Sequence, residues 1–203
     1  MYKFVLMRHG RSVADDEMKH EGRYDSELTE TGIAQAIMTS ERLLNSNYFF
    51  NAIITSPLKR ALKTAEIINE KYEIEIIKNE LLMEQDNGIL AGQNKKDALE
   101  KYPMPVFYSP FRYFPENSGE NEIMLHARGG LAVNSLINNA PGQYLIIGHG
   151  GILNAMIRNM LGINLKSNGS GVTFLLRDNG YIDIDYDENK NHWLIRNMIE
   201  GNN

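Results

Sequence analysis

The chain has 203 residues, of which 42% are hydrophobic and 23% are charged, with no cysteine and a formal net charge of −5. These proportions are typical of a globular protein and exclude a wholly disordered chain. The acidic balance argues against a protein whose whole surface binds nucleic acid or an anionic membrane, because such surfaces are basic. Without cysteine there is no disulfide bond, thiolate metal site or cysteine nucleophile.

The length fits one domain, which we expect to cover residues 1–203 with a single core. The apolar run at the N-terminus extends over only about six residues before Arg8, which is too short for the apolar region of a signal peptide. No run of about 18 apolar residues occurs in the chain. We therefore expect a cytoplasmic protein with no membrane or nucleic-acid partner.

The first part of the chain alternates between short apolar runs and helical periodicity. Residues 2–7 and 52–55 are apolar runs that predict buried strands. Thr29 can cap a helix, because apolar side chains follow it at helical spacing. Ser56, followed by Pro57, predicts the cap and first position of a second helix.

The same alternation continues along the chain. Residues 74–77 and 144–147 predict two more strands, and residues 120–139 predict a long helix despite a glycine pair in its middle. A further helix follows the fourth strand and runs through Leu161. Strands that are separated by helical crossovers lie parallel, with helices on both faces of the sheet.

The C-terminal part breaks this rule. Residues 172–176, a turn at 178–180 and residues 181–186 predict a β-hairpin, and a last strand is expected near 192–196. The predicted fold is therefore α/β, a three-layer α/β/α sandwich. Its sheet is mostly parallel, with antiparallel C-terminal edge strands.

One stretch fits neither period. Residues 102–115 contain four prolines and six aromatic residues, and proline excludes a regular helix or central strand there. So much aromatic surface is expected to pack rather than remain in water. We expect a lid-like insertion around residues 93–119, which is either an irregular cover for a helix end or a lid that faces the substrate.

Two histidines follow predicted buried strands and stand next to glycines. They are His9 and His149, and parallel strands bring such ends to one edge of the sheet. Phosphoryl transfer needs cationic groups, a nucleophile and a proton donor. The two histidines, Arg8, Arg60 and a carboxylic acid would supply that set.

Five blocks resemble the histidine phosphatase superfamily, also called the phosphoglycerate mutase-like family, and they occur in the order of that family. Residues 6–12 resemble its Arg-His-Gly signature, and residues 25–36 its Asp-x-x-Leu-Thr-x-x-Gly-x-x-Gln-Ala block. Residues 56–65 are similar to its Ser-Pro-Leu-x-Arg-Ala helix, residues 81–92 to the segment that carries the acid, and residues 148–151 to the segment of the second histidine. The resemblance covers residues 3 to 160, and five ordered blocks are far more specific than one.

The resemblance implies the phosphoglycerate mutase-like fold and a role for each matching residue. His9 is the nucleophile that forms a phosphohistidine, and Glu84 is the general acid and later the base, with Asp86 as the rival acid. Arg8, Arg60 and His149 take part in catalysis and bind the phosphoryl group. The binding set also includes Ser12 and Gly150. In this interpretation His149 is cationic beside bound phosphate, and no metal or cofactor takes part.

Departures from the family pattern concern three places. Asp15 stands where the family often has asparagine, and because a carboxylate would repel phosphate, either Asp15 turns away, it is protonated, or that contact is missing. The run Asp15-Asp16-Glu17 allows a divalent-metal cluster, although carboxylates of adjacent residues rarely converge and a solvated loop is the alternative. Glu120 lies in a segment that matches only partly, and Arg11 replaces a common Glu or Gln.

The prediction is a phosphatase of the histidine phosphatase branch that hydrolyses a small-molecule phosphomonoester without a metal. The first alternative is phosphoryl transfer of the cofactor-dependent phosphoglycerate mutase type, although such enzymes are usually longer. The second alternative is a protein that binds a phosphorylated ligand without turnover, which Asp15 motivates. The sequence leaves open whether the chain is a homodimer, and it names no substrate.

Overall fold

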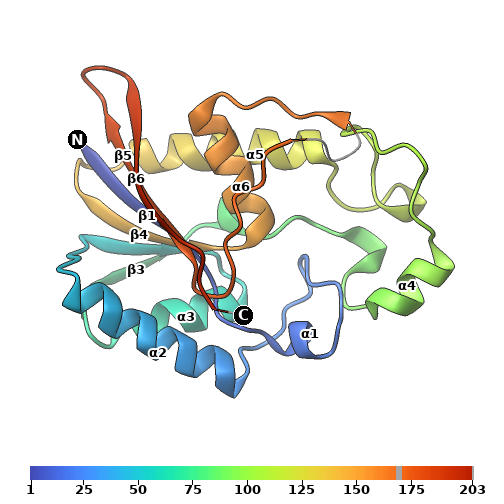
Figure 1. The fold of residues 1–203 in the computed structure, drawn as a ribbon, viewed down its shortest axis with the longest axis horizontal. Helices are drawn as coiled ribbons and strands as arrows, with labels where there is room; N and C mark the ends of the chain where they lie inside the picture. The colour runs from blue at the N-terminus through green and yellow to red at the C-terminus, as the bar shows by residue number, and fades with distance from the viewer. Residues whose placement is uncertain (168–170, 203) are drawn as a thin grey trace.

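A computed structural model describes residues 1–167 and 171–202 and contains one six-stranded sheet with strand order β3-β2-β4-β1-β5-β6 (Figure 1). The first four strands in this order are parallel, whereas β5 is antiparallel to both β1 and β6. The predicted mostly parallel sheet with antiparallel C-terminal edge strands is therefore confirmed. The strands are β1 (Tyr2–Arg8), β2 (Ala52–Thr55), β3 (Glu75–Lys78), β4 (Gln143–Gly148), β5 (Tyr181–Asp187) and β6 (His192–Ile199).

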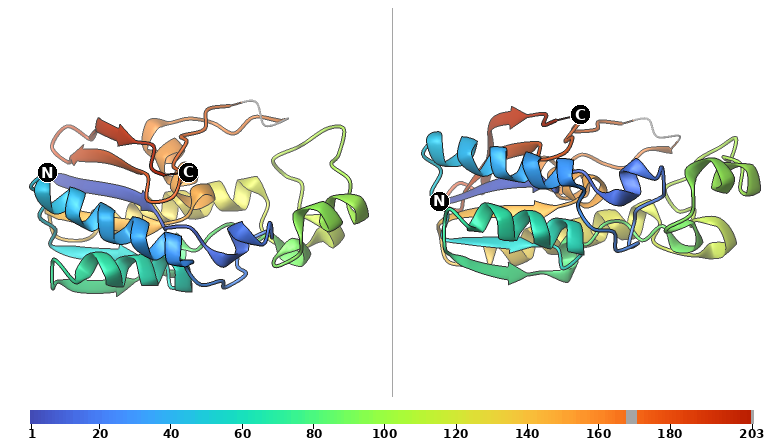
Figure 2. Two further views of the ribbon diagram at one scale, coloured as in Figure 1. Left: turned by 60° about the horizontal axis from the view of Figure 1, so that its bottom comes forward. Right: turned by 90° about the horizontal axis from the view of Figure 1, so that it is seen from below.

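Helices cover both faces of the sheet, as Figures 1 and 2 show. They are α1 (Val13–Asp16), α2 (Glu30–Asn45), α3 (Lys59–Asn69), α4 (Lys95–Lys101), α5 (Glu122–Ile137) and α6 (Gly150–Leu161), with short 3₁₀ turns η1 (Glu80–Leu82), η2 (Gly88–Leu90) and η3 (Pro115–Asn117). Within the described part of the chain, no helix has the length and apolar character needed to cross a membrane.

The core is split between the two faces of the sheet because side chains alternate along a strand. In β1, Phe4 and Leu6 belong to the core that contains α5 and α6, while Val5 and Met7 belong to the core that contains α2 and α3. Both faces of β1 are buried, as expected for a central strand of an α/β sheet.

The predicted cap of the second helix is wrong. Helix α3 begins at Lys59, after Leu58 as the cap residue, and Ser56 does not cap it. The carboxylate of Asp25, from a distant loop, accepts the backbone N–H of Lys59 at 2.7 Å and so supplies the missing cap. The hydroxyl of Ser56 instead accepts the N–H of Leu58 at 3.3 Å and lies 2.9 Å from the ring of His149.

The predicted strand at residues 172–176 is also wrong, because this segment is irregular in the structure. The side-chain oxygen of Asn154 on α6 accepts the N–H of Phe174 at 2.8 Å, and its amide donates to the Phe174 carbonyl at 3.0 Å. These bonds take the place of a sheet ladder. The hairpin forms instead between β5 and β6, and the last strand extends beyond the expected 192–196 to Ile199.

The glycine pair in α5 does not interrupt the helix. A Cβ atom on Gly129 would lie 2.8 Å from backbone and side-chain atoms of Ala155, so the glycine lets α5 pack closely on α6. The helix is shorter than expected because Asn121 caps it, with its side-chain oxygen accepting the N–H of Met124 at 2.9 Å.

The predicted insertion around residues 93–119 contains α4, which the sequence did not indicate, followed by an irregular segment at 102–113. Together with η3 it projects from the end of the sheet at which the parallel strands finish (Figure 2). We call residues 102–115 the aromatic segment.

Candidate active site

His9 lies directly after β1 and is fully buried. Its Nδ1 is 2.6 Å from the carbonyl oxygen of Gly10. Because a carbonyl can only accept, Nδ1 carries the proton and Nε2 carries the lone pair. The Nε–H of Arg60 points to Nε2 at 3.2 Å, so the free nitrogen of His9 faces a guanidinium.

Arg60 is fixed on every side. The first turn of α3 positions it, its side chain has no solvent exposure, and its terminal nitrogens donate to the carbonyls of Gly22 and Tyr24 at 2.8 and 2.9 Å. Its Nε also lies 3.1 Å from a carboxylate oxygen of Glu21. A buried arginine with ordered partners is a preorganised anion-binding group.

Arg8 is the second cation and ends β1. One terminal nitrogen lies 3.8 Å from Asp15 and the other 3.5 Å from Asp178. Asp15 does not turn away from the site, because its other oxygen accepts the N–H of Ser12 at 3.1 Å as part of the cap of α1. The carboxylate of Asp15, at the position where the family often has asparagine, therefore stays paired with Arg8.

His149 brings the second imidazole to the same edge of the sheet. Its ring centroid lies 4.9 Å from that of His9, and both side chains are buried. Its Nε2 contacts the hydroxyl of Ser56 at 2.9 Å, whereas its buried Nδ1 has no hydrogen-bond partner in the described part of the chain. An unpartnered buried nitrogen is costly unless water or a ligand satisfies it, so this atom is a candidate contact for a bound group.

The electrostatics of the pocket keep both imidazoles neutral. Burial, followed by the charges of Arg60 and Arg8, holds the pKa of His9 well below its usual range. Burial and Arg60 likewise hold the pKa of His149 well below its usual value. Without a bound anion His149 is thus neutral, and a negative charge beside the ring would favour the cationic form that is expected beside phosphate.

Glu84 sits at the N-terminus of α6. Its carboxylate accepts the backbone N–H groups of Gly151 and Ile152 at 3.0 and 3.2 Å, and that of Gln85 at 2.8 Å. A Cβ atom on Gly151 would lie only 2.5 Å from Oε1, so a side chain at this position would displace the carboxylate of Glu84. The rival acid, Asp86, instead accepts the N–H of Gly88 at 2.9 Å within its own loop.

A buried ion pair holds the loop that carries Glu84. Arg128 of α5 donates to both carboxylate oxygens of Glu120, at 2.8 and 2.6 Å. The same guanidinium donates to the carbonyls of Leu81, Met83 and Glu84 at 2.9, 2.6 and 3.1 Å. Glu120 is therefore linked through Arg128 to the backbone of Glu84, the predicted general acid.

The other predicted residues have separate places. Arg11 pairs with Asp16, and Glu17 pairs with Lys19, so the three adjacent acids contact three different cations rather than one another. No group of three metal-ligating side chains converges within residues 1–167 and 171–202. The hydroxyl of Ser12 is buried beside the carboxylate of Glu21, at 2.7 Å.

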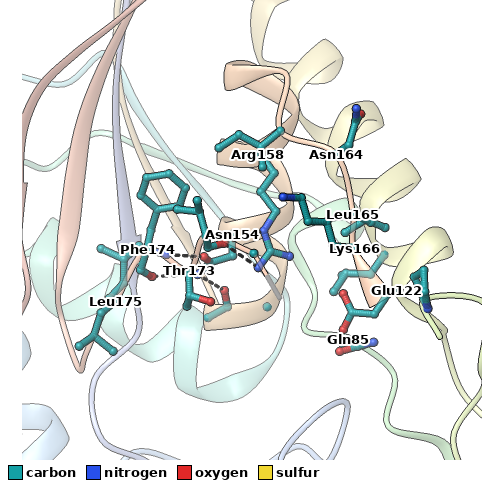
Figure 3. Close-up of a pocket in the computed structure, with 18 of the residues that line it drawn as sticks. Gln85, Glu122, Asn154, Arg158, Asn164, Leu165, Lys166, Thr173, Phe174 and Leu175 are labelled. Atoms are coloured by element: carbon teal, nitrogen blue, oxygen red, sulfur yellow. Dashed lines mark hydrogen bonds between the residues drawn. The ribbon is translucent and has the colours of Figure 1, made fainter. Parts of the chain in front are cut away.

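Two cavities adjoin Gln85, the neighbour of Glu84. A pocket of about 410 Å³, shown in Figure 3, is lined by Gly150, by side chains of α5 and α6, and by residues 163–166 and 171–176. A second cavity of about 600 Å³ is lined mainly by the aromatic segment. His20, the residue before Glu21 in the sequence, also lines it. Tyr108 borders both cavities, and Gly150 lines the first of them.

Sequence reasoning missed three residues of this constellation. Ser56 directly follows β2, so the rule that sites form at carboxyl ends of parallel strands would have identified it. Arg128 lies two helical turns from Glu120, but nothing in the sequence sets it apart from a solvated arginine. Glu21 lies in a loop with no periodicity, and no local signal distinguishes it.

Comparison with known proteins gives a consistent assignment. The family model described as the Histidine phosphatase superfamily (branch 1) matches residues 4–197. The chain is 32% identical over 163 residues to the "Uncharacterized phosphatase PhoE" of Bacillus subtilis, covering 80% of this chain and 79% of that protein. It is 39% identical over 105 residues to a 2,3-bisphosphoglycerate-dependent phosphoglycerate mutase of Elusimicrobium minutum, covering 50% of this chain and 42% of the mutase.

Among solved structures, Bacillus stearothermophilus YhfR matches with a TM-score of 0.84 and 26% identity, covering 99% of this chain and 97% of that one. The similarity therefore extends along almost the whole fold, including the edge strands. With phosphatases and mutases both among its relatives, the chain belongs to the histidine phosphatase superfamily.

Proposed function

We propose that the protein is a metal-independent phosphatase that hydrolyses a small-molecule phosphomonoester through a phosphohistidine on His9. The observation that carries this proposal is the bond from Nδ1 of His9 to the carbonyl of Gly10, at 2.6 Å. It fixes the tautomer in which Nε2 carries the lone pair, which attacks once Nε2 no longer accepts the N–H of Arg60. A neutral imidazole among cations is what a nucleophilic histidine requires.

In the first step Nε2 of His9 attacks phosphorus, so that a P–N bond forms while the bond from phosphorus to the leaving oxygen breaks. Glu84 delivers its proton to that oxygen, and an alcohol rather than an alkoxide departs. Charge accumulates on the three equatorial oxygens, where Arg8 and Arg60 complement it. The unpartnered Nδ1 of His149 supplies a further contact to the phosphoryl group.

In the second step Glu84, now ionised, accepts a proton from a water molecule whose oxygen attacks phosphorus. The P–N bond breaks, its electron pair returns to His9, and inorganic phosphate leaves. Glu84 ends the cycle protonated, ready for the next substrate. One carboxylic acid thus serves both steps because the leaving group and the water approach from the same side.

The aromatic cavity supports a leaving group with apolar surface. His20 and Gln85, which are the sequence neighbours of Glu21 and Glu84, are among the residues that line it. Most of the other lining residues are tyrosine, phenylalanine, methionine and proline, and Arg112 is the cation among them. A cavity of about 600 Å³ has room for a drug-sized group. The substrate proposed here is therefore a phosphomonoester of an aromatic or otherwise largely apolar alcohol.

The test combines phosphate release with detection of the intermediate. Purified protein is incubated with phenyl phosphate, naphthyl phosphate and glycerol phosphate in the presence of EDTA. The release of inorganic phosphate is measured, together with the acid-labile, base-stable phosphoryl label that remains on the protein. We expect release of phosphate and label in the wild type and neither in His9→Ala. Undiminished hydrolysis by His9→Ala would contradict the nucleophile, and loss of hydrolysis in EDTA would contradict metal independence.

The same experiment separates the mutase alternative. A mutase retains the phosphoryl group while its substrate reorients, so isomerisation of a phosphoglycerate would exceed the release of phosphate. Relatives of both kinds match about four fifths of this chain, so the ratio of isomerisation to phosphate release decides between the two reactions.

A further inference from the structure

The carboxylate of Glu21 lies beside two hydrogen-bond donors of the pocket around His9, namely Ser12 and Arg60. Its Oε1 accepts the hydroxyl of Ser12 at 2.7 Å and lies 3.1 Å from the Nε of Arg60. The same Nε–H faces Nε2 of His9 at 3.2 Å. A phosphoryl group bound to Nε2 would need these donors, so Glu21 holds the position of an anion in the pocket.

The backbone on both sides of Glu21 is fixed. The N–H of His20 donates to the carbonyl of Gln93 at 2.9 Å, and the carbonyl of His20 accepts the N–H of Gly92 at 2.8 Å. Arg60 holds the next carbonyl, that of Gly22. The carboxylate therefore leaves the donors by rotation of its own side chain, which is 15% exposed, rather than by movement of the loop.

Charges around the pocket are already paired. Two guanidiniums, Arg8 and Arg60, face three carboxylates, Asp15, Glu21 and Asp178. Three negative charges against two positive charges leave a formal charge of −1. Of the three, Glu21 alone pairs with Arg60, the guanidinium that contacts the nucleophile.

We propose that the carboxylate of Glu21 competes with bound phosphate for Arg60 and Ser12, the hydrogen-bond donors of the phosphoryl pocket. This inference rests on the proposed function only in taking His9, Arg8 and Arg60 as the phosphoryl pocket. Like charges within a few ångströms repel strongly in a site with little water. The competition weakens the binding of inorganic phosphate, the product, and so speeds its release.

The test measures the binding of a simple anion, so it does not depend on turnover. Inorganic phosphate and, separately, sulfate are titrated into the wild type, Glu21→Gln and Glu21→Ala by calorimetry at neutral pH. Both substitutions remove the charge, but only glutamine adds an amide donor. The matched control is Glu17→Gln, an exposed residue of the same loop that pairs with Lys19.

We expect the Kd for each anion to fall about tenfold or more in both Glu21 variants, which corresponds to about 1.4 kcal/mol, and to stay within about twofold of wild type in Glu17→Gln. In a hydrolysis assay, progress curves of Glu21→Gln should slow earlier because the product inhibits more strongly. A merely structural role would not produce that effect.

Three results would overturn the proposal. Unchanged or weaker anion binding in both variants would mean that Glu21 only supports Arg60 and Ser12. Tighter binding in Glu21→Gln alone would assign the effect to the new amide. Equal tightening in Glu17→Gln would assign it to net charge. If hydrolysis is absent but anion binding shifts as expected, the proposed function fails while the competition stands.

Discussion

The phosphoryl pocket and the aromatic segment are built in opposite ways. In the pocket, Arg60 and Arg128 are buried and bound to backbone carbonyls, so their positions depend on the main chain of the fold. In the aromatic segment, Val106 and Phe111 are exposed, and no helix or strand organises residues 102–113. The phosphoryl pocket is thus anchored in the fold, whereas the surface proposed to meet the leaving group can change without disturbing it.

The largest loss of hydrolysis rate is expected from substitution of Glu84, which belongs to the anchored part of the site. Glu84→Gln keeps the size of the side chain but removes the proton that the leaving oxygen needs, so kcat/KM for glycerol phosphate, which reports the first step, should fall by about 10²–10⁴-fold. For p-nitrophenyl phosphate, whose leaving group needs little protonation, the loss of kcat/KM should be much smaller, although kcat falls for both substrates because Glu84 also activates the water of the second step. The measurement is steady-state hydrolysis of both substrates.

The control for this prediction is Glu80→Gln, because Glu80 is the exposed acid at the start of η1 in the same segment. Its kinetics should match the wild type. An equal loss of kcat/KM with both substrates would show that Glu84 does not act as the acid, and a larger effect from Asp86→Asn would transfer the role to Asp86.

The next effect concerns the ion pair beneath the acid. Glu120→Ala leaves Arg128 as a buried cation without its carboxylate partner, which costs about 3 kcal/mol of unfolding free energy. Because Arg128 also holds the carbonyl of Glu84, kcat should fall with it. Urea unfolding and steady-state kinetics measure the two effects.

An exposed ion pair supplies the comparison for that variant. Glu66→Ala removes the partner of Lys63 on the surface of α3, where both side chains are about half exposed. Its cost should stay below about 1 kcal/mol. Similar costs for Glu120→Ala and Glu66→Ala would show that the pair under the site is no more important than one in solvent.

The pocket also predicts how stability depends on pH. Burial and Arg60 lower the pKa of His9 and of His149 in the folded state, whereas in the unfolded chain both titrate near pH 6.5. Below that pH the unfolded state takes up protons that the folded state excludes, so stability is lost as the pH falls. Each excluded proton costs up to about 1.4 kcal/mol per pH unit.

The free energy of unfolding is measured with urea between about pH 7.5 and 5.5, in buffers without phosphate or sulfate. This range extends to both sides of the pH at which the histidines of the unfolded chain titrate. The double variant His9→Ala/His149→Ala should show a shallower decline than the wild type over this range. Identical slopes would mean that the two imidazoles are not the groups that resist protonation.

The regular parts of the fold could be predicted from sequence because their patterns are local. The apolar runs fixed β1, β2 and β4, and the cap at Thr29 correctly starts α2. Where distant groups replace local ones, prediction failed. Asp25 caps α3 in place of Ser56, and Asn154 satisfies the backbone at Phe174 that was expected to form a strand.

The site follows the same division. His9, Arg8 and His149 could be predicted because strand ends of a parallel sheet converge. Their partners could not, because Glu21 and Arg128 reach the site from a loop and from the opposite layer through contacts over long sequence separations. The residues that tune the chemistry therefore depend on tertiary structure more than the residues that perform it.

The smallest effect is expected in the aromatic segment. Phe114 lines the aromatic cavity, and Phe111, three residues earlier, is exposed and lies outside that lining. Phe114→Ala should raise KM for naphthyl phosphate by about fivefold, since a partly buried ring contributes about 1 kcal/mol, and should leave glycerol phosphate unchanged. Phe111→Ala should change neither. If Phe114→Ala instead lowered kcat for both substrates, the segment would be part of the catalytic machinery, and the separation of chemistry from leaving-group binding would not hold.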